Sequence, residues 1–159
     1  MTPAHSTIED TEIDRTVALL GGRRTLHRPV HSRLEAHDLL QAGLPGHALK
    51  HLVSHVGILR VVNKGGLEKA IGISVRTYQR HQEALDRKLS PEQSGRTWKF
   101  AEILGRAIAL FGSQPEAEAW LEHPVMALDR RRPIDLLSTP AGVESVEGHL
   151  TRLEYGVYT

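Results

Sequence analysis

The segment from Ser90 to Gly112 carries the clearest helix signal in this chain of 159 residues. Ser90 suits a helix N-cap, Pro91 the first helical position and Gln93 the third, which is a capping-box pattern. A glycine such as Gly112 is typical of a helix end. Apolar residues recur in between at spacings of three and four, at Phe100, Ile103, Leu104, Ala107, Ile108 and Phe111. We therefore expect a long amphipathic helix here.

The remaining helix signals predict an all-α fold. Aromatic residues make up 4% of the chain and hydrophobic residues 40%, so the core must consist mostly of Leu, Val, Ile and Ala. Ser32 followed by Glu35 is a second capping-box pattern, which opens a helix at 34–42. Apolar spacing predicts another helix at 45–56. This composition suits a small helical bundle.

Other segments give weaker or open signals. Residues 1–14 have no periodicity and are expected to be mobile, with a short helix from Ile13 to Leu20. The β-branched run at 58–62 fits a strand or a connector equally well. Toward the C-terminus, Ser113 begins a shorter helix. The last apolar row consists of Val143, Val146, Leu150 and Leu153.

The net charge of +1 conceals a segregation of charge along the chain. Residues 60–99 hold nine Lys and Arg against four acidic residues, whereas residues 100–159 hold five against nine. This suggests two partners with different electrostatic demands, although the solvated faces of helices also produce patchy charge. The chain has no cysteine, no apolar run long enough for a membrane span and no signal-peptide pattern, so we expect a cytoplasmic protein.

The basic middle of the chain resembles a helix-turn-helix over residues 67–80. Gly72 permits the turn, Ser74 caps the second helix, and Val75 and Tyr78 are expected to face inward. The polar residues of the second helix are of the types that contact base edges and phosphates. The predicted DNA-binding residues are Lys64, Arg76, Thr77, Gln79 and Arg80.

The first helix of this motif departs from the usual pattern. A small residue normally stands four positions before the turn glycine, where this chain has Glu68, and Gly65-Gly66 shortens the helix. Two ordinary helices joined at a glycine are therefore the alternative interpretation.

Two of the three tyrosines of the chain, Tyr155 and Tyr158, lie in the last five residues. Protein ends are usually polar and frayed, whereas tyrosine is enriched where proteins contact partners. The segment is either a tail folded onto its own core or a plug that enters a pocket of another protein. We predict the plug, formed by Arg152, Leu153, Glu154, Tyr155, Gly156, Val157, Tyr158 and Thr159.

From about residue 89 onward the chain resembles the toxin-binding domain of the Xre/MbcA/ParS antitoxin family. Its most specific elements are Pro133-Ile134-Asp135-Leu136-Leu137 and Tyr155-Gly156-Val157-Tyr158. The helix-turn-helix lies where the Xre branch has one. Further matching segments are Leu89-Ser90-Pro91-Glu92-Gln93-Ser94-Gly95-Arg96, Phe111-Gly112, Ala119-Trp120-Leu121, His123-Pro124, Ala127-Leu128, Gly142 and Leu153-Glu154.

The resemblance implies an antitoxin that binds a RES-domain toxin consuming NAD⁺, covers its active site and represses their shared operon through operator DNA. We expect three regions: an N-terminal helical segment at 1–57, a helix-turn-helix region at 58–88 and a toxin-binding domain at 89–159. The helices at 34–42 and 45–56 would dimerise the chain and pair two recognition helices.

No catalytic group, cofactor or membrane partner is predicted. His47, His51 and His55 share one helical face, but no open metal-site motif accompanies them, so a polar or interface stripe is the preferred interpretation. No nucleophile triad, P-loop or dinucleotide motif occurs. The alternative to an antitoxin is a stand-alone helix-turn-helix regulator whose C-terminal half dimerises or senses a ligand.

Overall fold

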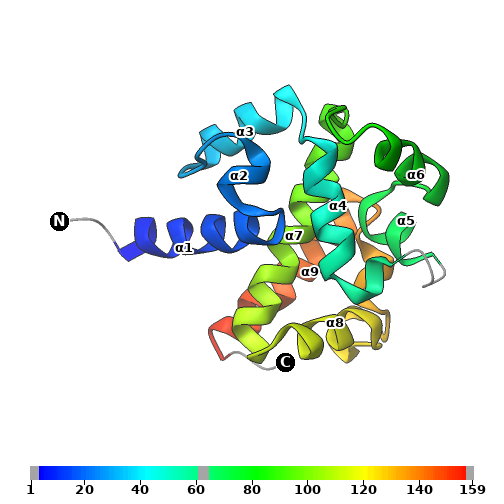
Figure 1. The fold of residues 1–159 in the computed structure, drawn as a ribbon. Helices are drawn as coiled ribbons and strands as arrows, with labels where there is room; N and C mark the ends of the chain where they lie inside the picture. The colour runs from blue at the N-terminus through cyan, green and yellow to red at the C-terminus, as the bar shows by residue number, and fades with distance from the viewer. Residues whose placement is uncertain (1–3, 61–64, 157–159) are drawn as a thin grey trace.

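The computed structural model describes residues 4–60 and 65–156, with side chains from residue 8 onward, and shows an all-α protein (Figure 1). Within these residues β-structure is limited to two isolated bridges, Pro45 with Lys88 and Val125 with Arg131. The α-helices are α1 (Ala4–Leu19), α2 (Gly22–Leu26), α3 (Arg33–Ala42), α4 (Gly46–His55), α5 (Gly66–Ile71), α6 (Val75–Glu83), α7 (Pro91–Phe111), α8 (Gln114–Glu122) and α9 (Pro140–Glu154). Short 3-10 helices are η1 (Gly57–Leu59), η2 (Met126–Leu128) and η3 (Pro133–Leu136).

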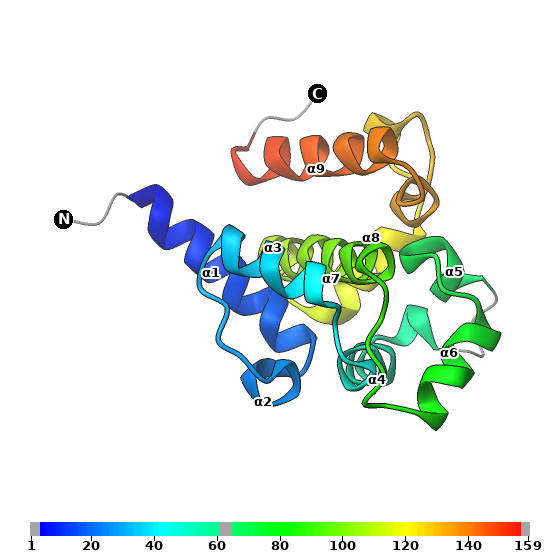
Figure 2. The same ribbon diagram turned by 90° about the horizontal axis from the view of Figure 1, so that it is seen from above.

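The long amphipathic helix predicted from Ser90 to Gly112 exists as α7, and it is the centre of the core. The Ser90 side chain accepts the backbone N–H of Gln93 at 3.1 Å, and Gln93 Oε1 accepts the Ser90 N–H at 3.0 Å, which completes the capping box. Gly112 ends the helix in the left-handed conformation. Helices α1, α3, α5, α8 and α9 all pack on α7, which lies between α4 and α9 (Figure 2).

The prediction of a mobile segment over residues 1–14 is wrong for residues 4–14, which form most of α1. The helix lacks an amphipathic pattern because it contacts the core along only part of its length, through buried Ile13, Thr16 and the following Leu20. Arg15 Nη1 also donates to the carbonyl of Gly105 in α7 at 3.2 Å. Long-range contacts therefore stabilise α1, and the local periodicity of the sequence does not reveal such contacts.

The helices predicted at 34–42 and 45–56 exist as α3 and α4, but the apolar face of α4 is used inside the chain. Leu49 and Leu52 are fully buried, so α4 has no free apolar row for dimerisation. Of the run at 58–62, residues 58–60 form a 3-10 turn and a bend, which makes them a connector, and residues 61 and 62 lie outside the described residues. Across the described ranges, we find no helix with the length and apolar character that spanning a membrane requires.

Candidate DNA-binding and toxin-binding sites

Helices α5 and α6 form the helix-turn-helix, and the turn between them is built as predicted. Gly72 has φ 70°, which favours glycine, and its backbone N–H donates to Glu68 O at 2.8 Å. The Ser74 hydroxyl oxygen accepts the backbone N–H of Thr77 at 3.1 Å and so caps α6. Gly66 allows the close packing that opens α5, since a Cβ there would clash with the carbonyl oxygen of Ile58.

The polar face of α6 points to solvent. Arg76, Gln79 and Arg80 are exposed, whereas Tyr78 is buried. The prediction that Val75 faces inward is wrong: it is 40% exposed, whereas the nearby Ile73 is buried. Thr77 is half-buried, and its hydroxyl accepts a hydrogen bond from Ser74, so it supports the turn. Lys64 lies outside the described residues.

The first helix of the motif is tied to the C-terminal half of the chain by Arg96 of α7. Its Nη2 donates to the carbonyl of Lys69 at 3.2 Å and to that of Leu137 at 3.3 Å. The guanidinium also lies against Gly72, where a Cβ would meet Nη1. Burial lowers the pKa of Arg96. Arg96 therefore bridges the helix-turn-helix and the segment that follows η3.

Asp135 of η3 makes a second link to α5. Arg132 donates to both carboxylate oxygens at 2.9 Å, and Lys69 Nζ lies 3.1 Å from Oδ1. The hydrogen bonds from Arg132 first, and then the contact with Lys69, lower the pKa of Asp135 to about 2 against the opposing effect of burial. The carboxylate is thus held ionised between two cations.

We expect Asp135→Asn to lower the free energy of unfolding at pH 7 by about 1 kcal/mol, because the side chain is 37% exposed and water screens its ion pairs. The folded pKa is depressed, so the contribution is present above the unfolded pKa of about 4 and disappears as the pH falls toward 2. Urea unfolding of both proteins at several pH values measures this. A difference that persists unchanged at pH 2 would contradict the assignment.

Helix α9 is fixed to α7 along its length. Val146 and Leu150 are fully buried, and Lys99 of α7 lies 3.2 Å from Glu147. Near the end of α9, Arg106 donates to both carboxylate oxygens of Glu154 at 3.1 Å. Glu154 is therefore bound within the chain and anchors the last turn of the helix.

Directly after this anchor the chain presents an exposed aromatic side chain. Tyr155 is 78% exposed, and Gly156 has φ 70°, which turns the backbone away from the helical path. Arg152 is exposed and Leu153 half-buried. The predicted plug residues Val157, Tyr158 and Thr159 lie outside the described residues.

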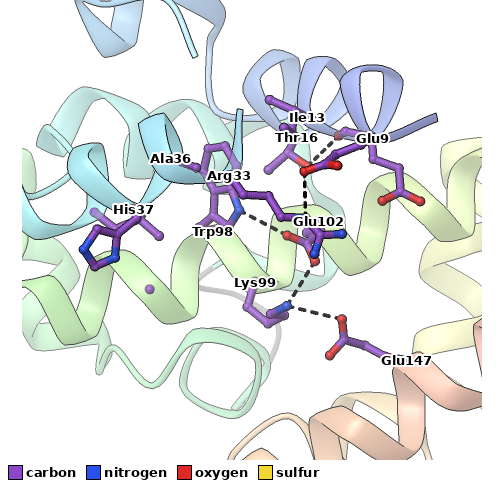
Figure 3. Close-up of a pocket in the computed structure, with 13 residues that line it drawn as sticks. Glu9, Ile13, Thr16, Arg33, Ala36, His37, Trp98, Lys99, Glu102 and Glu147 are labelled. Carbon is purple, nitrogen blue, oxygen red and sulfur yellow. Dashed lines mark hydrogen bonds and ion pairs between the residues drawn. The ribbon is translucent and has the colours of Figure 1, made fainter. Parts of the chain in front are cut away.

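A cavity of about 410 Å³ lies between α1, α3, α7 and α9 (Figure 3). Its ionic side chains largely pair with one another: Arg33 lies 2.9 Å from Glu9, and Lys99 lies 3.0 Å from Glu102 and 3.2 Å from Glu147. Trp98 Nε1 also donates to Glu102 at 3.1 Å. These pairs connect α1 with α3 and α9 with α7, so the charged residues of the cavity wall stabilise the packing of these helices.

The histidine stripe of α4 is occupied by internal contacts. His51 Nδ1 lies 3.2 Å from Leu19 O, His55 Nδ1 lies 2.8 Å from His51 O, and the two rings stack with centroids 4.1 Å apart. His47 lies 3.2 Å from Asp86. The part of the chain that the structure describes holds no group of three or more residues suited to a metal ion.

The two candidate sites lie on opposite sides of the molecule, since α6 and the end of α9 are far apart in both views (Figures 1 and 2). A helix-turn-helix with an exposed basic helix, joined to a second helical unit ending in an exposed tyrosine, defines a DNA-binding protein with a protein-binding domain. Comparison with known families agrees. The antitoxin Xre-like helix-turn-helix domain matches residues 35–102, and the antitoxin Xre/MbcA/ParS C-terminal toxin-binding domain matches residues 106–156. The chain belongs to the Xre/MbcA/ParS-type antitoxins.

Two similar proteins are both named antitoxin Xre. That of Yersinia enterocolitica is 29% identical over 109 residues, which are 68% of this chain and 73% of that protein. That of Pseudomonas putida is 28% identical over 125 residues, 79% of this chain and 74% of that protein. Antitoxins and helix-turn-helix regulators are generally not enzymes. The boundaries at 57 and 88 stay a prediction.

Sequence reasoning missed residues beside α6. Arg87 and Lys88, in the loop that follows this helix, line a cavity together with Arg80. The signal that could have indicated them is a pair of adjacent cations directly after the predicted recognition helix. The anchor between Arg106 and Glu154 was also missed, because the partners lie on different helices.

Proposed function

We propose that this antitoxin neutralises a RES-domain toxin that consumes NAD⁺ by covering its active site with the segment from Arg152 to Thr159, and that it represses its own operon through operator DNA. The observation that carries the proposal is Tyr155, a 78% exposed aromatic side chain at the end of an anchored helix. Large apolar groups exposed at ordered positions are typical of interfaces. The position lies within residues 106–156, which match the toxin-binding domain.

The chemistry of the segment suits a dinucleotide site. A site for NAD⁺ is concave and combines phosphate-binding groups with an apolar or aromatic slot. The flat, amphipathic ring of Tyr155 fits such a slot, and Gly156 lets the backbone approach a wall closely. Because Val146, Leu150 and the Arg106–Glu154 pair fix α9, little conformational entropy is lost when its end binds.

On this basis Tyr155→Ala is expected to weaken inhibition of the toxin by about tenfold, since a side chain that is 78% exposed contributes little to this fold but would fill a pocket in the proposed complex. NAD⁺ consumption by the purified toxin is measured at increasing antitoxin concentration. Leu34→Ala is the matched control, because Leu34 is 77% exposed but lies outside residues 106–156, which match the toxin-binding domain. Equal inhibition by the Tyr155 variant and wild type would contradict the role of this ring.

The DNA-binding half of the proposal places α6 in the major groove, with two copies of the chain on a palindromic operator. Arg76, Gln79 and Arg80 are the exposed residues of the helix that supply contacts to bases and phosphates.

Co-expression with the product of the adjacent gene tests the pairing with a toxin. An adjacent product that is not a RES-domain protein, with no co-purification, would favour the stand-alone regulator.

A further inference from the structure

A basic cavity of about 360 Å³ lies beside α6 and is not explained by the base-reading residues. Its wall comes from α6, from the loop after it and from the start of α7. Three of its lining residues are cations, Arg80, Arg87 and Lys88, and no acidic residue of the described chain lines it. The cavity therefore concentrates positive charge in a concave site.

This charge is not neutralised within the described part of the chain. None of the three cations has an ion pair or a side-chain hydrogen bond there, whereas Lys99 and Arg106 each have carboxylate partners. The nearby Asp86 faces His47 at 3.2 Å. Uncompensated cations around a cavity favour an anionic ligand.

Two further features of the cavity suit an anion: a buried polar atom without a partner and the N-terminal end of a helix. His81 lines the cavity, is 8% exposed, and has a buried Nδ1 without a hydrogen-bond partner among the described residues. Burial first, and then the charge of Arg87, lower its pKa. Ser90 and Gln93 at the start of α7, a helix of 21 residues, also line the cavity and place the positive end of the helix dipole there.

We propose that this cavity binds a phosphate of the DNA backbone that flanks the bases contacted by α6. The inference rests on the proposed operator binding and adds the residues that hold the strand. Arg80 joins the two sites, because it belongs both to the exposed face of α6 and to the cavity wall. Duplex DNA carries a continuous row of phosphates beside any helix in its groove, so an anion-binding cavity at this place meets the backbone.

The test is the double variant Arg87→Ala with Lys88→Ala in the full chain, on the duplex upstream of its own gene and on an unrelated duplex. Phosphate contacts carry no sequence information, so affinity is expected to fall about tenfold on both duplexes. The slope of log K against log salt should decrease in magnitude by about 0.9, the value for the loss of one phosphate contact. Arg130→Ala with Arg131→Ala removes the same charge outside residues 35–102, which match the helix-turn-helix domain, and should leave both quantities near wild type.

Each other outcome overturns the inference in a distinguishable way. Unchanged affinity and slope refute the phosphate site while leaving operator binding intact, and a decrease confined to the operator assigns these residues to base reading. If the wild type binds neither duplex, the operator proposal fails and this one with it. A titration with inorganic phosphate, followed by the NMR signals of His81, tests whether the cavity is a site for free phosphate. Saturation below about 1 mM, together with an unchanged salt slope on DNA, would overturn the assignment to the DNA backbone. Thermal unfolding checks that each variant is folded.

Discussion

Deleting residues 156–159 is expected to restore NAD⁺ consumption by the proposed RES-domain toxin almost completely, while the antitoxin remains folded and still binds DNA. The deletion begins beyond the Arg106–Glu154 pair and beyond buried Leu150, so no core contact of the described residues is removed. The remaining surface of α9 and its neighbours still offers an interface, so the complex should persist. The measurement is NAD⁺ turnover by the co-purified complex, with the full-length and the shortened antitoxin side by side.

Two controls make this result interpretable. Circular dichroism and thermal unfolding establish that the shortened chain is folded, and co-purification establishes that it still binds the toxin. Because α6 lies on the opposite side of the molecule from the end of α9, the affinity for operator DNA should stay within about twofold of wild type (Figure 1). If the shortened chain inhibits fully, the plug is wrong, and steric cover by the helical body or trapping of an inactive toxin assembly takes its place.

Helices with strong signals at both ends could be predicted from sequence. The Ser90–Gln93 capping box and Gly112 determine the limits of α7 by local interactions alone. Ser74 determines the start of α6 in the same way. Only the end of helix α1, from Ile13 onward, could be predicted, since contacts that stabilise the helix are long-range, such as the bond from Arg15 to Gly105 O.

The same distinction between local and long-range interactions applies to the candidate sites. The exposure of Arg76, Gln79 and Arg80 follows from helical periodicity once the start of α6 is known. The link between Lys69 and Asp135 joins residues from different halves of the chain, and no sequence pattern indicates it. From its position in the sequence, Glu154 is expected to be an unpaired anion that contacts the toxin. In the structure its carboxylate lies 3.1 Å from Arg106, so it belongs to the anchor of α9. Side-chain pairing across helices is therefore the part of these sites that sequence alone does not supply.

The double variant Arg76→Ala with Arg80→Ala is expected to weaken operator binding by about 2–3 kcal/mol, on the order of a hundredfold, and to reduce its salt dependence. Both side chains are exposed on one face of α6 and form no ion pair within the described residues, so their removal costs the fold little. Unlike the loop variant at 87 and 88, this change should also reduce the preference for the operator over unrelated DNA, because we propose that these positions contact the bases. Fluorescence anisotropy on both duplexes measures affinity and preference together.

Toxin inhibition provides the internal reference for this variant. The end of α9 is remote from α6 in both views, so NAD⁺ consumption in the presence of the double variant should match that with wild type (Figure 2). Arg23→Ala with Arg24→Ala, which removes two exposed cations from α2, controls for the change in net charge. An operator shift that is unchanged by Arg76→Ala with Arg80→Ala would show that α6 does not read the DNA. Loss of toxin inhibition together with DNA binding would instead indicate a folding defect, which thermal unfolding of the variant decides.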